Sequence, residues 1–249
     1  MRLTGEERGL REGAELHLTT PLLLLAGVCL AVIPWLHPNN TCSDWLMKWG
    51  QLARHPLWLP IHELAMAGFA LGAAGAMGLA FVGGRSALGV LSGGIMAAGL
   101  AIQAMLVLLH ATVVSRLGEA FNAASTDPER RLFRTLAEAV VAYDVAGSRV
   151  AAALLSTGAA LLAWHLRRRE ALSPLTALVF AGLGSVWGFQ TLGLFGRLHI
   201  PTSEWIPYTS LALWMGGLGL LLLARRREPI ANPARGDGRN HEKPLPQEP

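Results

Sequence analysis

The sequence predicts an all-α fold: a polytopic transmembrane bundle of six helices with both termini in the cytoplasm. Of its 249 residues, 52% are hydrophobic and only 15% are charged, whereas about 25% are charged in a typical soluble domain. Long uncharged stretches alternate with short charged connectors, and arginine clusters recur at the ends of these stretches. The net charge of +4 therefore indicates anchoring at a lipid bilayer, and we expect no nucleic-acid partner.

Each expected span is close to or longer than the ~20 residues that cross a hydrocarbon core of ~30 Å. The third and fourth are longer, so we expect them to tilt or to project beyond the bilayer. The transmembrane domain covers 19–226, between a cytoplasmic tail at 1–18 and a disordered cytoplasmic tail at 227–249 that is rich in Pro, Gly and charge. The spans are 19–35, 59–82, 87–114, 136–166, 172–195 and 206–224.

The arginine clusters set the orientation. Arg167–Arg169 follow the fourth span and Arg225–Arg227 follow the sixth. An even number of spans places both clusters on one side, and the side richer in Lys and Arg is cytoplasmic. We therefore expect a multi-pass protein of the cell membrane, which is the inner membrane if the source is a Gram-negative bacterium.

Two longer connectors are expected to form a compact extracytoplasmic cap. The connector 37–58 carries Trp45, Leu46 and Trp49 and is expected to form a short helix on the outer membrane surface. The connector 116–135 is polar, and its segment 125–129 (STDPE) resembles a helix cap with proline in the first turn. The fourth helix is therefore expected to begin outside the bilayer, near Pro128.

Polar residues inside the spans are the main functional clue, because ionisable groups at membrane depth are costly. With ~1.5 Å of rise per residue, they fall in the outer half of the bundle, and the inner half holds almost none. This asymmetry predicts a polar pocket that opens to the extracytoplasmic side. The candidate ligand-binding residues are Glu63, Gln103, Asp144, Arg149 and Gln190.

Helical phase divides these residues further. Gln103 and His110 share one stripe of the third span. Asp144 and Arg149 are five residues apart, about 140° around the helix axis, so Arg149 is expected to pair with Glu63 on the second span. Such a pair would serve a ligand pocket or act as a purely structural lock between two spans.

His62 and His110 are the candidate metal ligands. They approach the outer surface on consecutive antiparallel spans, and two such histidines can hold a divalent metal or a haem iron. Glu63 and Asp144 would supply carboxylates nearby. The alternative is that both histidines are solvated or hydrogen-bonded to a carboxylate. The His-Glu pair at 62–63 is not a His-Glu-x-x-His zinc motif, because position 66 is Met66.

Three hypotheses follow from these residues. The first is a protein that binds or transports a small polar ligand or ion in the outer pocket. The second is a metal- or haem-dependent membrane redox protein that uses His62 and His110. The third is a non-catalytic membrane assembly component that supports a partner protein. No motif names a reaction, so the catalytic residues and the oligomeric state are left open.

Overall fold

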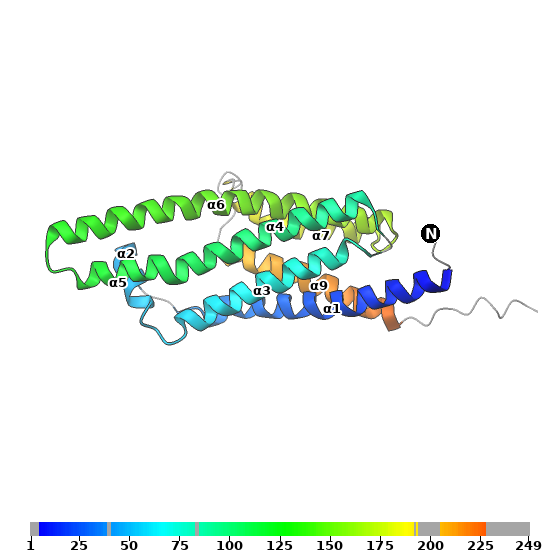
Figure 1. The fold of residues 1–249 in the computed structure, drawn as a ribbon, viewed down its shortest axis with the longest axis horizontal. Helices are drawn as coiled ribbons and strands as arrows, with labels where there is room; N and C mark the ends of the chain where they lie inside the picture. Colours follow the sequence, from blue (N-terminus) through cyan, green and yellow to red (C-terminus); the bar gives the residue numbers. More distant parts are fainter. Residues whose placement is uncertain (1–4, 39–40, 83–84, 192, 194–204, 228–249) are drawn as a thin grey trace, which may run out of the picture.

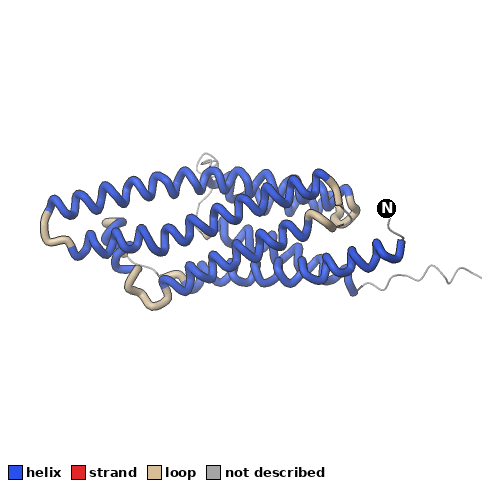
Figure 2. The backbone as a smooth tube through the Cα atoms, in the orientation of Figure 1, coloured by secondary structure: helices blue, strands red, loops and turns tan. Residues whose placement is uncertain are grey.

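A computed structural model describes residues 5–38, 41–82, 85–191, 193 and 205–227. Throughout these residues it is an elongated bundle of helices without a strand (Figures 1 and 2). The long helices run side by side, and the short ones gather at one end. The elements are α1 (Gly5–Leu36), α2 (Trp45–Leu52), α3 (Trp58–Leu79), α4 (Ala87–Leu109), the π-helical turn η1 (His110–Val114), α5 (Ser115–Ala123), α6 (Asp127–Arg168), α7 (Pro174–Thr191) and α9 (Ile206–Arg227).

Within the described residues, five segments are long and apolar enough to cross a membrane. They are His17–Leu36 of α1, α3, the continuous helix from α4 through α5 (Ala87–Ala123), α6, and Ile206–Arg225 of α9. Large apolar side chains cover the outside of the bundle, and Leu18, Met105 and Leu175 are each at least 70% exposed. Such a surface suits contact with lipid, since soluble monomers rarely expose large contiguous apolar patches.

The fifth expected span, 172–195, corresponds to α7, which has 18 residues and is not among these five segments. It packs along α6 and α9, and its expected end at Phe195 lies outside the described residues. The expected C-terminal tail lies outside them too, except for Arg227. The expected N-terminal tail and the first span form one continuous helix that begins at Gly5. The Glu, Arg and Leu residues of the tail have high helix propensity, which favours this continuation.

The start of α1 and the end of α9 lie at the same end of the bundle (Figure 1). The α6 helix also ends there, followed by the turn into α7. In that turn the main-chain oxygen of Glu170 accepts two hydrogen bonds of 3.2 Å from the guanidinium of Arg225. We call this end, defined by Arg167–Arg169 and Arg225–Arg227, the arginine end. Its placement in the cytoplasm stays a prediction.

Close helix contacts hold the middle of the bundle together. A Cβ atom on Gly158 of α6 would lie 2.6 Å from the backbone nitrogen of Met96 on α4, so the two backbones nearly touch, as small residues allow in membrane bundles. Fully buried apolar side chains fill the space around this contact, among them Leu30, Phe69, Leu100 and Trp214. The middle of the bundle is therefore a packed apolar core.

The opposite end carries the cap, which consists of α2, α5 and the first part of α6. The α2 helix was expected on the membrane surface, but it packs on α5. A Cβ on Gly50 of α2 would lie 2.3 Å from the carbonyl oxygen of Gly118 on α5, and Leu46 is buried with Phe121 and Ala137. The apolar face of α2 is thus covered by protein.

The start of α6 agrees with the sequence. Thr126 caps the helix, its hydroxyl accepts from the Glu129 amide, and the Glu129 carboxylate accepts from the Thr126 amide in return. This is a capping box, and it confirms that the helix begins beside Pro128. The connector that precedes it is more helical than expected, because residues 116–123 continue the third span as α5.

Candidate functional site

A cavity of about 310 Å³ lies where the cap meets the bundle. Side chains from α1, α2, α3, α4, α6 and α9 line it, together with His37, Pro38 and Trp205 next to these helices. We call it the histidine cavity, because three of its lining residues are histidines. Its polar and aromatic lining residues are His37, Lys48, Trp49, His62, Gln103, His110, Asp144, Ser148, Trp205 and Tyr208.

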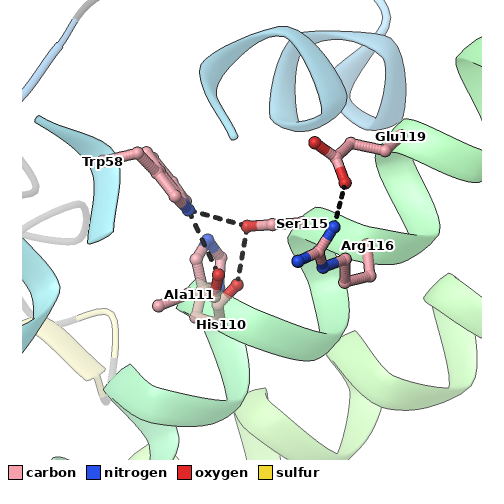
Figure 3. A network of polar contacts seen from close by, with 6 residues as sticks. All are labelled: Trp58, His110, Ala111, Ser115, Arg116 and Glu119. Carbon is pink, nitrogen blue, oxygen red and sulfur yellow. Dashed lines mark hydrogen bonds and ion pairs between the residues drawn. The ribbon is translucent and has the colours of Figure 1, made fainter. Parts of the chain in front are cut away.

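The π-helical turn η1 places His110 at the cavity. Its wider turn is stabilised by side chains: Ser115 Oγ donates to the main-chain oxygen of His110 at 3.1 Å. The indole nitrogen of the buried Trp58 on α3 donates to Ser115 Oγ at 2.8 Å and to the oxygen of Ala111 at 3.2 Å (Figure 3). Single π-helical turns inside α-helices occur often at functional sites.

His62 is held by its own helix. Its Nδ1 atom lies 2.7 Å from the main-chain oxygen of Trp58. A carbonyl oxygen can only accept, so Nδ1 carries the proton and Nε2 carries a lone pair. The Trp58 ring lies against the imidazole, with centroids 4.2 Å apart. The ring of His62 is therefore fixed in orientation and in tautomer.

His110 is fixed from two sides. Its Nδ1 atom lies 3.7 Å from the carboxylate of Asp144 on α6. Its ring meets that of Trp49 edge to face, with centroids 4.1 Å apart, so the cap helix α2 rests directly on it. The His62 and His110 rings are nearly parallel, with 11° between their planes and 6.2 Å between centroids.

His37 adds a third imidazole to the same wall. It follows the end of α1, and its ring centroid lies 5.7 Å from that of His62 and 4.9 Å from that of Trp205. Its Nδ1 atom lies 3.0 Å from the oxygen of Pro38.

Two buried polar atoms that line the cavity have no hydrogen-bond partner in the described structure. They are Gln103 Oε1 and His110 Nε2. Gln103 is only 6% exposed. A buried polar atom without a partner costs about 1–3 kcal/mol, and each such atom calls for an explanation, such as a bound water, ion or ligand.

The structure brings together four of the seven residues selected from the sequence. Gln103 and His110 lie on one wall, as helical phase predicts, and Asp144 joins them from α6 with Ser148 one turn further on. His62 completes the group from α3. In the described part of the chain, no three His, Cys, Asp or Glu side chains converge closely enough to form a metal cage.

The other three residues lie elsewhere. Glu63 and Arg149 are exposed on the outside of the bundle, and neither takes part in an ion pair among the described residues. The expected Glu63–Arg149 pair is therefore wrong. The reason is helical phase: Glu63 is turned about 100° from His62, which faces the cavity. Arg149 lines a separate lateral groove between α6 and α7. Gln190 lies on α7 and does not line the histidine cavity.

Sequence reasoning missed the aromatic wall and one histidine. His37 was not among the candidate ligands, and Trp49, Trp205 and Tyr208 were not assigned to the pocket. One signal was present for His37: it follows the first span at the same end of the bundle as His62 and His110. Counting depth for connector residues as well as for span residues would have grouped the three histidines.

No protein-family model, curated protein or solved structure matches this chain. What the protein does must therefore be argued from the histidine cavity itself.

Proposed function

We propose that this protein is a six-span membrane protein that binds a small polar ligand or ion in the histidine cavity. The observation that carries the proposal is a pair of buried atoms, Gln103 Oε1 and His110 Nε2, which lie on the wall of one cavity and have no hydrogen-bond partner among the described residues. A volume of about 310 Å³ is at the lower end of the roughly 300–1,000 Å³ of small-molecule sites. The ligand is therefore small.

The lining favours a ligand that donates hydrogen bonds. His62 presents a lone pair on Nε2, since its other ring nitrogen donates to Trp58. Gln103 presents its amide oxygen, and Asp144 presents a carboxylate. Lone pairs from three elements, α3, α4 and α6, thus surround one space.

Binding is favoured over transport. Directly below the cavity, toward the arginine end, the walls close. Leu30, Phe69 and Leu100 are fully buried there, each one or two turns from a cavity residue on the same helix. A polar solute would need a path through this apolar layer, so the proposed role is that of a site reached from the cap end.

The cap end faces the extracytoplasmic side in this proposal. Arginines gather at the other end of the bundle, and the positive-inside rule places them in the cytoplasm. With α7 counted as a further crossing, the number of spans is even, which agrees with the start of α1 and the end of α9 lying at the same end of the bundle (Figure 1).

A thiol placed in the cavity tests access to the site. In a chain whose two cysteines, Cys29 and Cys42, are replaced by alanine and serine, Ser148→Cys lines the cavity. We expect a membrane-impermeant methanethiosulfonate to label it from outside intact cells. The matched control is Ser92→Cys, because Ser92 is a fully buried serine in the core and should stay unlabelled. If Ser148→Cys is labelled no more strongly than Ser92→Cys, whether the reagent is added outside or inside the cell, the proposal is overturned.

A further inference from the structure

The groove between α6 and α7, which we call the lateral groove, lies apart from the histidine cavity. Its volume is about 570 Å³, within the roughly 300–1,000 Å³ of small-molecule sites. Side chains between Arg149 and Thr157 on α6 and between Ser185 and Thr191 on α7 line it. We propose that the lateral groove binds an anionic phospholipid, with an acyl chain in the groove and the phosphate on Arg149. This second site does not depend on the ligand of the histidine cavity.

The floor of the lateral groove is a close contact between the two helices. A Cβ atom on Gly188 would overlap Ser156 Oγ, so α6 and α7 touch there. Ala152 and Ala153 line the α6 side next to this contact, and their short side chains leave space above it. Two of the lining residues, Ala153 and Phe189, are exposed on the outside of the bundle. The groove therefore opens onto the apolar surface that suits contact with lipid.

Three hydroxyl groups on the walls donate their protons to the protein itself. Ser185 Oγ donates to the main-chain oxygen of Ala181 at 2.8 Å. Thr191 Oγ1 donates to the main-chain oxygen of Trp187 at 2.8 Å, and Ser156 Oγ donates to that of Ser185 at 3.5 Å. A hydroxyl has a single proton, so these three have no donor left for a polar ligand. An acyl chain needs no donor, and it fits walls of this kind.

Arg149 brings a positive charge to the end of the groove nearer the cap. It is exposed and takes part in no ion pair among the described residues. With ~1.5 Å of rise per residue, it lies about 26 Å along α6 from Leu166 at the arginine end. A hydrocarbon core is ~30 Å thick, so Arg149 is close to the interface at the cap end. Its side chain leans toward the start of α6, which is the direction of the phospholipid phosphates.

The charge and the apolar walls together select a phospholipid. A cation at membrane depth is costly without a partner, and a guanidinium binds phosphate oxygens through two parallel hydrogen bonds. Basic sites between transmembrane helices bind anionic headgroups in this way. A free phosphate would leave the groove empty, and an acyl chain alone would leave Arg149 without an anion. A zwitterionic headgroup carries its own ammonium group near the phosphate, so an anionic headgroup is favoured.

Native mass spectrometry of the full-length protein in detergent tests the inference. The delipidated protein is titrated with phosphatidylglycerol, and separately with phosphatidylcholine of the same acyl chains. We expect one phosphatidylglycerol per chain at concentrations at which phosphatidylcholine is not retained. A phosphatidylglycerol with a diazirine in its acyl chain should cross-link to residues 149–157 or 185–191. Both readouts use the unaltered chain, so they do not depend on whether a variant folds.

Substitutions of Arg149 test the phosphate contact. Arg149→Gln should weaken phosphatidylglycerol binding by roughly ten- to a hundredfold, as expected for the loss of hydrogen bonds to a charged group. Arg149→Lys should weaken it less, because lysine keeps the charge but lacks the planar fork. The matched control is Arg131→Gln. Arg131 is also exposed on α6, but it lies about 27 Å further toward the cap at ~1.5 Å per residue, so binding should be unchanged.

A bulky side chain tests the acyl-chain contact. Ala153→Phe fills the lateral groove from its exposed side and should weaken phosphatidylglycerol binding at least tenfold while Arg149 is still present. The matched control is Ala160→Phe. Ala160 is exposed on the same face of α6 two turns further on and does not line the groove, so this variant should bind as the parent does.

Several outcomes would overturn the inference. Phosphatidylglycerol binding that Arg149→Gln or Ala153→Phe leaves unchanged would do so, as would equal losses in these variants and in their controls. Cross-links confined to other helices would place the lipid elsewhere. Displacement of the lipid by inorganic phosphate or by chain-free glycerophosphoglycerol at equal concentration would indicate a site for a free anion. Labelling of Ser148→Cys is independent of these results, so failure at the lateral groove leaves the histidine cavity as proposed.

Discussion

The two ends of the bundle use histidine in opposite ways. At the arginine end, His165 of α6 is 2% exposed and fills the space left by Gly89, whose Cβ would lie 2.9 Å from the ring. Its Nδ1 atom lies 3.3 Å from Ser86 Oγ. At the cap end, His37, His62 and His110 stand around a cavity with a carboxylate and an amide in reach.

The contrast shows when a buried polar group indicates a binding site. The ring of His165 is also buried, but it packs against Gly89 and interacts with the main chain of Val82, and it does not line the histidine cavity. Burial of an imidazole alone therefore reflects packing. A buried imidazole indicates a candidate site only where it lies beside a cavity and further polar side chains. The π-helical turn and the cap provide both at the other end of the bundle.

The largest expected effect is at the indole that organises the cap end. Trp58→Ala removes a side chain that is only 2% exposed, together with its hydrogen bonds to Ser115 and Ala111. Loss of a buried tryptophan costs about 3–5 kcal/mol. Unfolding of the protein in detergent, followed by circular dichroism, should show this loss.

Trp164→Ala is the matched control for this change. Trp164 lies on α6 near the arginine end and is 52% exposed. Its loss should cost far less in detergent. Equal destabilisation by the two changes would mean that the cap end is not organised around Trp58.

The second effect tests close packing in the middle of the bundle. Gly158→Ala puts a Cβ 2.6 Å from the backbone nitrogen of Met96, so α4 and α6 must separate. Overpacking of this kind costs about 1–3 kcal/mol. Gly94→Ala on α4 meets nothing within 4 Å and should be neutral or stabilise by up to ~1 kcal/mol through helix propensity. Melting temperatures that fall together would contradict the contact.

The sequence predicted those features that depend on composition and on helical phase. Apolar length located the long helices, and the capping segment located the start of α6. Helical phase placed Gln103 with His110. Phase also turns Glu63 about 100° away from the inward-facing His62, which is incompatible with the expected Glu63–Arg149 pair.

The remaining features depend on contacts between distant segments. The α2 helix is amphipathic, and a membrane surface or a protein surface would satisfy its apolar face equally well. Only the close approach of Gly50 to Gly118 shows which of them covers it. The π-helical turn likewise depends on a contact between Ser115 and Trp58, which are 57 residues apart in the chain. No local sequence pattern therefore predicts it.

The third effect concerns the attachment of α2 over the cavity. Asp44 caps α2 by accepting from the Leu46 and Met47 amides, and its carboxylate pairs with Arg134 of α6 at 2.5 Å. Asp44→Ala should cost about 1 kcal/mol through loss of the cap, with at most ~1 kcal/mol more from the exposed ion pair. Hydrogen exchange of the Leu46 and Met47 amides should become faster.

Acidic pH should weaken the attachment of α2 in the same way as Asp44→Ala. Burial acts to raise the pKa of Asp44, but the Met47 amide, Arg134 and the Leu46 amide together hold it below its usual value of 3.8. A lowered folded pKa stabilises the protein above 3.8, and the contribution is lost as pH falls through the folded value. Asp44→Asn keeps a capping oxygen, so its α2 exchange should not show this acid step; a step of equal size there would assign the titration to another group.

The smallest effect is expected at the charges on the outside of the bundle. Arg149 is exposed on α6, and its long side chain can reach along the helix toward the outer interface. Arg149→Gln should therefore change the stability of the isolated, lipid-free protein by no more than about 0.5 kcal/mol, and it should leave thiol labelling of the Ser148→Cys variant unchanged. Glu63→Gln on α3 is the companion change and should be as mild. For Glu63→Gln, a loss of stability that appears only in native membranes, and not after purification, would indicate that this outward charge contacts a partner protein. That surface would then be a second candidate for function beside the cavity.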